Sequence, residues 1–155
     1  MGWPMLTNNN VHRLLATQIV PFWEAIKFSC IKADEVSEKD MPSYLNELLQ
    51  ALLSDKAQCF VVLNDERILQ GITVTRIVTD KIFSKKELLL QTFYSMKVVT
   101  EEETKKYFKI LYDLAIKENC TALTFSSKNA KIWEMAKLVG CKELNRNFAF
   151  ELGGK

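Results

Sequence analysis

The sequence contains no glycine between Gly71 and Gly140. This gap includes a predicted strand-to-helix junction at residues 95–106, where an α/β protein of this layout ordinarily binds a phosphate. Pyrophosphates are bound by closely approached backbone N–H groups and a free helix N-terminus, and glycine makes that approach possible. Glu101, Glu102 and Glu103 stand there instead and would repel an anion. The sequence therefore lacks the best-known device for binding a phosphate-bearing cofactor.

Histidine is also scarce. His12 is the only one, which excludes a histidine-based catalytic triad or a two-histidine metal site. The four cysteines have no C-x-x-C spacing and stand beside apolar residues, so we expect buried, reduced thiols rather than a metal site or disulfides. They are Cys30, Cys59, Cys120 and Cys141.

Long apolar runs and strong charge bias are missing as well. No run approaches the ~18 residues of a membrane span, and residues 1–5 do not resemble a signal peptide, so we expect a cytoplasmic protein. The 21 basic and 19 acidic residues are interspersed, which argues against nucleic-acid and membrane partners. With 155 residues, 48% of them hydrophobic, we expect one domain over residues 1–155.

Apolar periodicity predicts six strands and four helices. The strands are expected at residues 11–16, 58–63, 68–78, 87–98, 121–125 and 143–152, and the helices at 17 or 21 to 33, 41–53, 101–118 and 128–139. Asp40 with Pro42 starts the second helix, and Thr100 with Glu103 forms a capping box for the third. The order β-α-α-β-β-β-α-β-α-β indicates an α/β (α+β) protein with a mixed, mostly antiparallel sheet flanked by helices.

This order resembles the GNAT acetyltransferase fold over nearly the whole chain. The turn before Gly71 resembles that family's central hairpin, and Asn129 followed by Gly140-Cys141 resembles its last helix and final strand. The resemblance places an acetyl-CoA site at the junction of residues 96–100. It implies that Met96 and Val98 align the pantetheine arm through their backbone groups, with Lys105 and Asn129 as further cofactor contacts; capping of a helix start explains Asn129 equally well.

The sequence also departs from the family. Around residues 101–107 only Lys105 has chemistry suited to the pyrophosphate loop, and Ala136 stands where many members carry a tyrosine that protonates the leaving thiolate. Glu87 is a candidate general base and Tyr94 a candidate proton donor, although a solvated glutamate and a core-packing tyrosine are the simpler interpretations.

These departures favour a phage-encoded GNAT-like protein that lacks a cofactor and acts as a scaffold or virion component, in the host cytoplasm or the particle. The resemblance extends to divergent phage-encoded members of the family. An active N-acetyltransferase using acetyl-CoA with a non-standard loop is the alternative, and a small-molecule or peptide sensor is a third. A protein partner or phage assembly would contact Trp3, Met5 and Leu6, unless these apolar residues fold back onto the domain.

Overall fold

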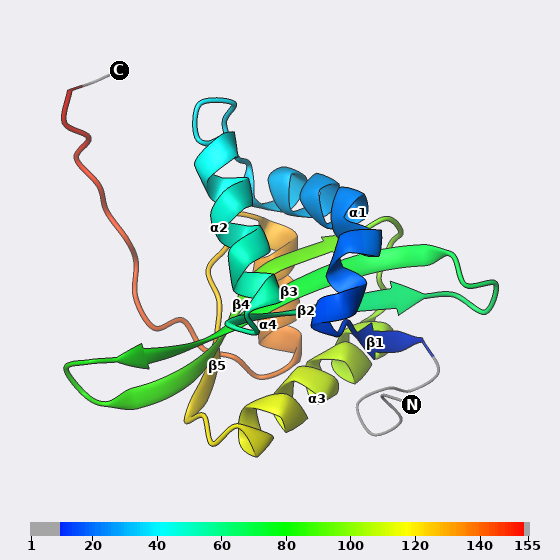
Figure 1. Ribbon diagram of the computed structural model, residues 1–155. Helices are drawn as coiled ribbons and strands as arrows, with labels where there is room; N and C mark the ends of the chain where they lie inside the picture. The colour runs from blue at the N-terminus through cyan, green and yellow to red at the C-terminus, as the bar shows by residue number, and fades with distance from the viewer. Residues whose placement is uncertain (1–9, 154–155) are drawn as a thin grey trace.

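The protein is built around a five-stranded sheet with the strand order β1-β2-β3-β4-β5 (Figure 1). The computed structural model describes residues 10–153. The strands are β1 (Val11–Arg13), β2 (Ala57–Leu63), β3 (Leu69–Asp80), β4 (Lys85–Ser95) and β5 (Ala122–Thr124). The helices are α1 (Ala16–Asp34), α2 (Met41–Leu53), α3 (Glu101–Lys117) and α4 (Ala130–Leu138). This is the predicted mixed, mostly antiparallel architecture.

Strands β4 and β5 are the parallel pair of the sheet, while β1 to β4 pair antiparallel. The helix α3 connects β4 to β5, which confirms the predicted β-α-β unit. Their pairing is limited to Glu87–Leu89 with Ala122–Thr124. From Leu90 to Ser95, β4 pairs within the described residues with β3 alone. We call the opening beside this part of β4 the fork.

The helices cover both faces of the sheet. Helices α1 and α2 pack on one face, where the core includes Ile26, Leu48 and Val61. Helix α3 packs on the other face with Phe60 and Leu88. Successive residues of β2 enter the two cores in turn, because side chains alternate across a sheet that is buried on both sides.

The first predicted strand is too long, and the first predicted helix starts slightly late. β1 ends at Arg13: the Leu14 backbone N–H still donates to the Cys59 carbonyl in register with β2, but Leu15 is already the N-cap of α1. The first helix begins at Ala16, ahead of both predicted starts, because the Gln18 side chain accepts a hydrogen bond from the Leu15 backbone N–H and closes the helix start there.

The predicted last strand at residues 143–152 is also wrong. The segment has the alternation of a strand, but a strand forms only where neighbouring backbone groups pair with it, and no described strand does. Its large apolar side chains are exposed: Leu144, Phe148, Phe150 and Leu152. Figure 1 shows this segment leading away from the body of the protein.

The cysteine expectation holds for Cys30 and Cys59, which are buried. Cys120 and Cys141 are only half-buried, because they follow α3 and α4 at the edge of the sheet where few elements cover them. Among residues 10–153, no helix is long and apolar enough to span a membrane, and no three potential metal-ligating side chains gather. The proposed partner contacts Trp3, Met5 and Leu6 lie outside the described residues.

Candidate functional site

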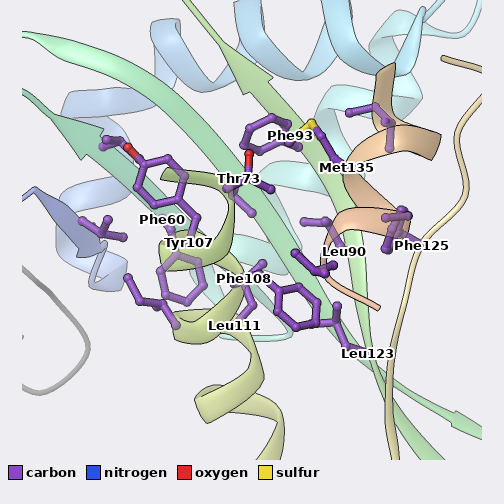
Figure 2. A pocket seen from close by; sticks show the side chains of 17 residues that line it. Phe60, Thr73, Leu90, Phe93, Tyr107, Phe108, Leu111, Leu123, Phe125 and Met135 are labelled. Carbon is purple, nitrogen blue, oxygen red and sulfur yellow. The ribbon is translucent and has the colours of Figure 1, made fainter. Parts of the chain in front are cut away.

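An apolar cavity of about 100 Å³ lies at the fork, between the sheet and helices α3 and α4 (Figure 2). All five strands reach it, from Val11 on β1 to Leu123 on β5. Its outer wall consists of side chains from the chain after β5 and from α4: Phe125, Ile132, Met135, Ala136 and Val139. A cavity of this character suits an apolar group with few polar atoms.

Tyr107 is one of the polar residues that line this cavity. The other polar side chains that line it are Thr73 and Thr104. Tyr107 also borders a smaller hollow of about 10 Å³ with Lys97 and Ser95, so it stands where the two spaces meet. Burial, and then the nearby Glu103 carboxylate, raise the pKa of Tyr107, which keeps its hydroxyl protonated. From the sequence, Tyr107 is one residue of the apolar stripe of α3, and nothing in the pattern predicts that it lines a cavity.

The start of α3 carries the predicted capping box. The Thr100 hydroxyl accepts a hydrogen bond from the Glu103 backbone N–H, and the Glu103 carboxylate accepts one from the Thr100 backbone N–H. The Lys97 ammonium pairs with Glu103 and lowers the pKa of this carboxyl group. Glu101 and Glu102 are exposed, and within the described residues neither forms an ion pair. The helix start therefore keeps two uncompensated negative charges.

A polar cluster lies on the opposite face of β4. The Thr92 hydroxyl donates to Asp34 at the end of α1, at 3.1 and 3.0 Å from the two carboxylate oxygens. The Tyr44 hydroxyl of α2 donates to the same carboxylate. Burial and this hydrogen bond raise the pKa of Tyr44, so Tyr44 remains a donor. The carboxylate of Asp34 is thus held by two hydroxyl groups.

A β-bulge in β4 places the residues of this cluster on the strand segment that borders the fork. Val74 is opposite Thr92 while Thr75 is opposite Leu90, so Gln91 is an extra residue in β4. Side chains two apart on a regular strand face the same side, yet Leu90 lines the cavity and Thr92 contacts α1. The bulge therefore places the cavity and the Asp34 carboxylate on the two faces of one short stretch of strand.

Arg76 borders this cluster. Its guanidinium donates to both carboxylate oxygens of Glu47 at 2.8 and 2.7 Å and also to the side-chain oxygen of Gln91. The pair lowers the pKa of Glu47. Burial raises the pKa of Cys30, whose thiol lies beside Asp34, to about 11. The carboxylate of Glu47 therefore forms an ion pair with Arg76, whereas the carboxylate of Asp34 accepts hydrogen bonds from hydroxyl groups.

Similarity to solved structures, and not similarity of sequence, identifies the fold of this chain. No protein-family model matches the sequence, and no curated protein is similar to it in sequence. A solved structure of a probable acetyltransferase is similar, with a TM-score of 0.69, 13% identity and coverage of 94% of this chain and 99% of that one. The chain has the GNAT acetyltransferase fold.

Two further structures with this fold are informative. An aminoglycoside N-acetyltransferase in complex with CoA has a TM-score of 0.68 and 13% identity, covering 93% of this chain and 94% of that one. A ribosomal-protein-alanine N-acetyltransferase from Brucella melitensis has a TM-score of 0.67 and 10% identity, covering 92% and 99%. The acetyltransferase fold thus spans nearly the whole chain.

The two predicted catalytic residues lie away from the cavity in this acetyltransferase fold. Glu87 stands near the start of β4, opposite Ala122 of β5, and does not line the cavity. Tyr94 projects from the other face of β4 and packs edge-to-face on Phe28 of α1, with ring centroids 5.8 Å apart. The residues of β4 that do line the cavity are Leu90 and Phe93.

The predicted cofactor contacts lie in the loop after β4, on α3 and at the start of α4, and none of them lines the cavity. Met96 donates its backbone N–H to Gln70, and Val98 is 88% exposed in the loop before α3. Lys105 is exposed on the first turns of α3. Asn129 caps α4, because its side-chain oxygen accepts a hydrogen bond from the Lys131 backbone N–H. No described interaction ties these four side chains together.

Proposed function

We propose that the protein is an N-acetyltransferase that transfers an acetyl group from acetyl-CoA to an amine. The observation that carries the proposal is the fork: one stretch of β4 has an apolar cavity on one face and a hydrogen-bonded carboxylate on the other. The acetyltransferase fold supports it, and one protein with this fold is known in complex with CoA.

The fork is suited to an acyl donor. Backbone groups of β4 from Leu90 to Ser95 on the edge away from β3 pair with no described strand, so they can bond to the amide groups of a pantetheine arm. The cavity walls, among them Phe93 and Met135, would enclose the apolar part of the donor. Lys97 and Lys105 are the cations nearest in sequence to the α3 start, where the phosphates would lie.

Asp34 is suited to the acceptor. A protonated amine at the end of α1 would meet, in the half-buried Asp34 side chain, a carboxylate already fixed by two hydroxyl groups. Preorganisation of this kind favours binding, since no side chain has to be ordered when the amine arrives. The amine loses a proton to Asp34 or to water, and its nitrogen then attacks the thioester carbonyl carbon. The C–N bond forms, the nitrogen gives up its second proton to water, and the C–S bond breaks.

The departing thiolate needs a proton. Ala136 cannot supply it, although Ala136 lines the cavity at the wall formed by α4. We assign this step to Tyr107, which lines both the cavity and the hollow beside Lys97 and whose raised pKa keeps the hydroxyl protonated. The phenol would donate its proton to sulfur and recover one from solvent.

A second candidate is a non-catalytic protein with a degenerate site, such as a scaffold. The charges of Glu101 and Glu102 at the start of α3 favour it, since they oppose a bound pyrophosphate. The comparisons give no support to a phage or virion role.

Calorimetric titration with acetyl-CoA, followed by a thiol-release assay with a panel of amines, tests the proposal. Saturable binding and amine-dependent release of CoA are expected, with a loss of release but retained CoA binding in Asp34→Asn. The absence of saturable binding at millimolar acetyl-CoA would support the non-catalytic candidate instead.

A further inference from the structure

The cavity at the fork is larger than an acetyl group requires. Its volume is about 100 Å³. A methylene group is similar in size to a water molecule, whose share of liquid volume is ~30 Å³. The cavity therefore holds roughly three or more such groups, whereas an acetyl group has a single methyl beyond its carbonyl carbon. A donor with a short acyl group would leave most of this space unfilled.

The lining of the cavity suits hydrocarbon. Its polar side chains are Thr73, Thr104 and Tyr107, and none of the described residues that line it is charged. The Thr104 hydroxyl already donates to the backbone oxygen of Thr100. Figure 2 shows aromatic and aliphatic side chains, among them Leu90, gathered around the space. Cavities with such linings bind hydrocarbon more readily than water, and a carboxylate would lose its hydration there without gaining a partner.

The cavity adjoins the hollow beside Lys97. The two spaces share the lining residues Val62, Thr73, Phe93 and Tyr107. Under the proposed function the thioester lies next to Tyr107, where the two spaces meet. The part of the acyl chain beyond the carbonyl carbon then extends into the cavity.

Ala136 leaves room at the outer wall of the cavity. It lines this wall together with Ile132 and Val139, four residues before it and three after it along the chain, which places the three side chains on one face of the helix. The side chain of Ala136 is a single methyl group, so a larger residue at this position would extend into the cavity. Ala136 therefore sets the length of chain that the cavity admits.

We infer that the preferred donor is an acyl-CoA with an unbranched, saturated chain of about four to six carbons, whose tail fills the cavity beside Ala136. The inference rests on the proposed function and gives its donor class: the bonds that form and break are those of the acetyl transfer. Each methylene group that enters the cavity strengthens binding about fourfold, because it moves from water to an apolar site.

Calorimetric titration of the full chain with acetyl-CoA, butyryl-CoA, hexanoyl-CoA and succinyl-CoA tests the inference. Butyryl-CoA and hexanoyl-CoA should bind at least about 10-fold more tightly than acetyl-CoA. Succinyl-CoA has the chain length of butyryl-CoA but ends in a carboxylate, so it should show no such gain. Equal Kd values for the acetyl, butyryl and hexanoyl donors would overturn the inference and leave the proposed function intact. If no acyl-CoA binds, the proposed function fails together with it.

Ala136→Leu adds three carbon atoms at the outer wall and should abolish the advantage of hexanoyl-CoA over acetyl-CoA. Ala130→Leu is the matched control: the same substitution at an exposed position of α4 that does not line the cavity should preserve the advantage. Thermal melting shows whether both variants fold. If Ala136→Leu does not fold, Met135→Ala takes its place, because it enlarges the cavity and should shift the preference toward longer chains. An unchanged preference in a folded cavity variant would show that the chain binds elsewhere and would overturn the inference.

Discussion

The hydroxyl oxygen of Thr92 lies 3.0 Å from the nearer carboxylate oxygen of Asp34. The two residues belong to β4 and α1, and Thr92 is almost completely buried. This bond fixes a carboxylate against the strand that borders the cavity. Under the proposed function it determines where an acceptor amine binds.

Asp34→Asn should lower kcat/KM for the amine by about 10–100-fold, because a hydrogen bond to a charged group contributes about 1.5–3 kcal/mol. The amide oxygen can still accept from Tyr44 or Thr92, so stability should change little. Steady-state kinetics with thermal melting checks both. Asp40→Asn is the control, because Asp40 is an exposed carboxylate bonded to Ser37 before α2; an equal loss of activity there would remove the special role of Asp34.

Replacing Glu101 and Glu102 by glutamine should strengthen acetyl-CoA binding, most clearly at low salt, because two exposed negative charges at the start of α3 are removed. Calorimetric Kd values at two salt concentrations measure the effect. Glu66→Gln in the β2–β3 turn is the control for net charge. An unchanged Kd in the double variant would show that the phosphates bind elsewhere.

Glu103→Gln should behave differently from that double variant. A glutamine can still accept the Thr100 backbone N–H in the capping box but cannot form the ion pair with Lys97, so the replacement should cost about 0.2–1 kcal/mol of stability in addition to any change in affinity. Chemical denaturation of the two variants side by side makes the comparison. Equal stability of both would show that the Lys97 pair contributes nothing measurable.

Much of the fold follows from local sequence. The helix Met41–Leu53 repeats apolar residues every three or four positions, and the Thr100–Glu103 box marks a helix start within four residues. The parallel β4–β5 pair follows from the element order, since a helix connects the two strands. At residues 143–152 the alternation of apolar and polar residues was not enough to predict a strand correctly. Alternation indicates that one face of a segment is apolar, but it does not show which strand of the sheet pairs with the segment.

The candidate site could be predicted only in part. The junction between β4 and α3 was predicted at its place in the chain, because the strand and the capping box identify it. Asp34 and Thr92 are 58 residues apart, and the Gln91 bulge that turns Thr92 toward α1 has no glycine or proline to mark it. Tyr107 looked like one more apolar position of a helix. A single sequence does not show which residue of a stripe meets a cavity.

Tyr107→Phe should lower kcat by about 10²–10⁴-fold if the phenol protonates the thiolate, because general acid catalysis contributes on that scale. The pKa of Tyr107 is raised, so the protonated, active form persists to higher pH than for an ordinary tyrosine. The activity of the natural enzyme should therefore fall only at strongly alkaline pH, and this decline should disappear in the variant. Tyr112→Phe, an exposed position on the same helix, is the control; a pH profile unchanged by Tyr107→Phe would assign the proton to water.

Gly71→Ala tests how closely β3 must approach the end of β4. A Cβ atom at Gly71 would lie 3.1 Å from the backbone oxygen of Tyr94, so β4 would have to move by a few tenths of an ångström next to the fork. We expect a loss of about 1–3 kcal/mol in stability and a higher KM for acetyl-CoA. Gly140→Ala is the matched comparison: its φ of +90° makes alanine strained, but no atom lies within 4 Å of the added Cβ. It should lose stability without a change in KM, because it strains the chain without displacing β4. If the two variants showed the same KM, the position of the β4 end would not control donor binding.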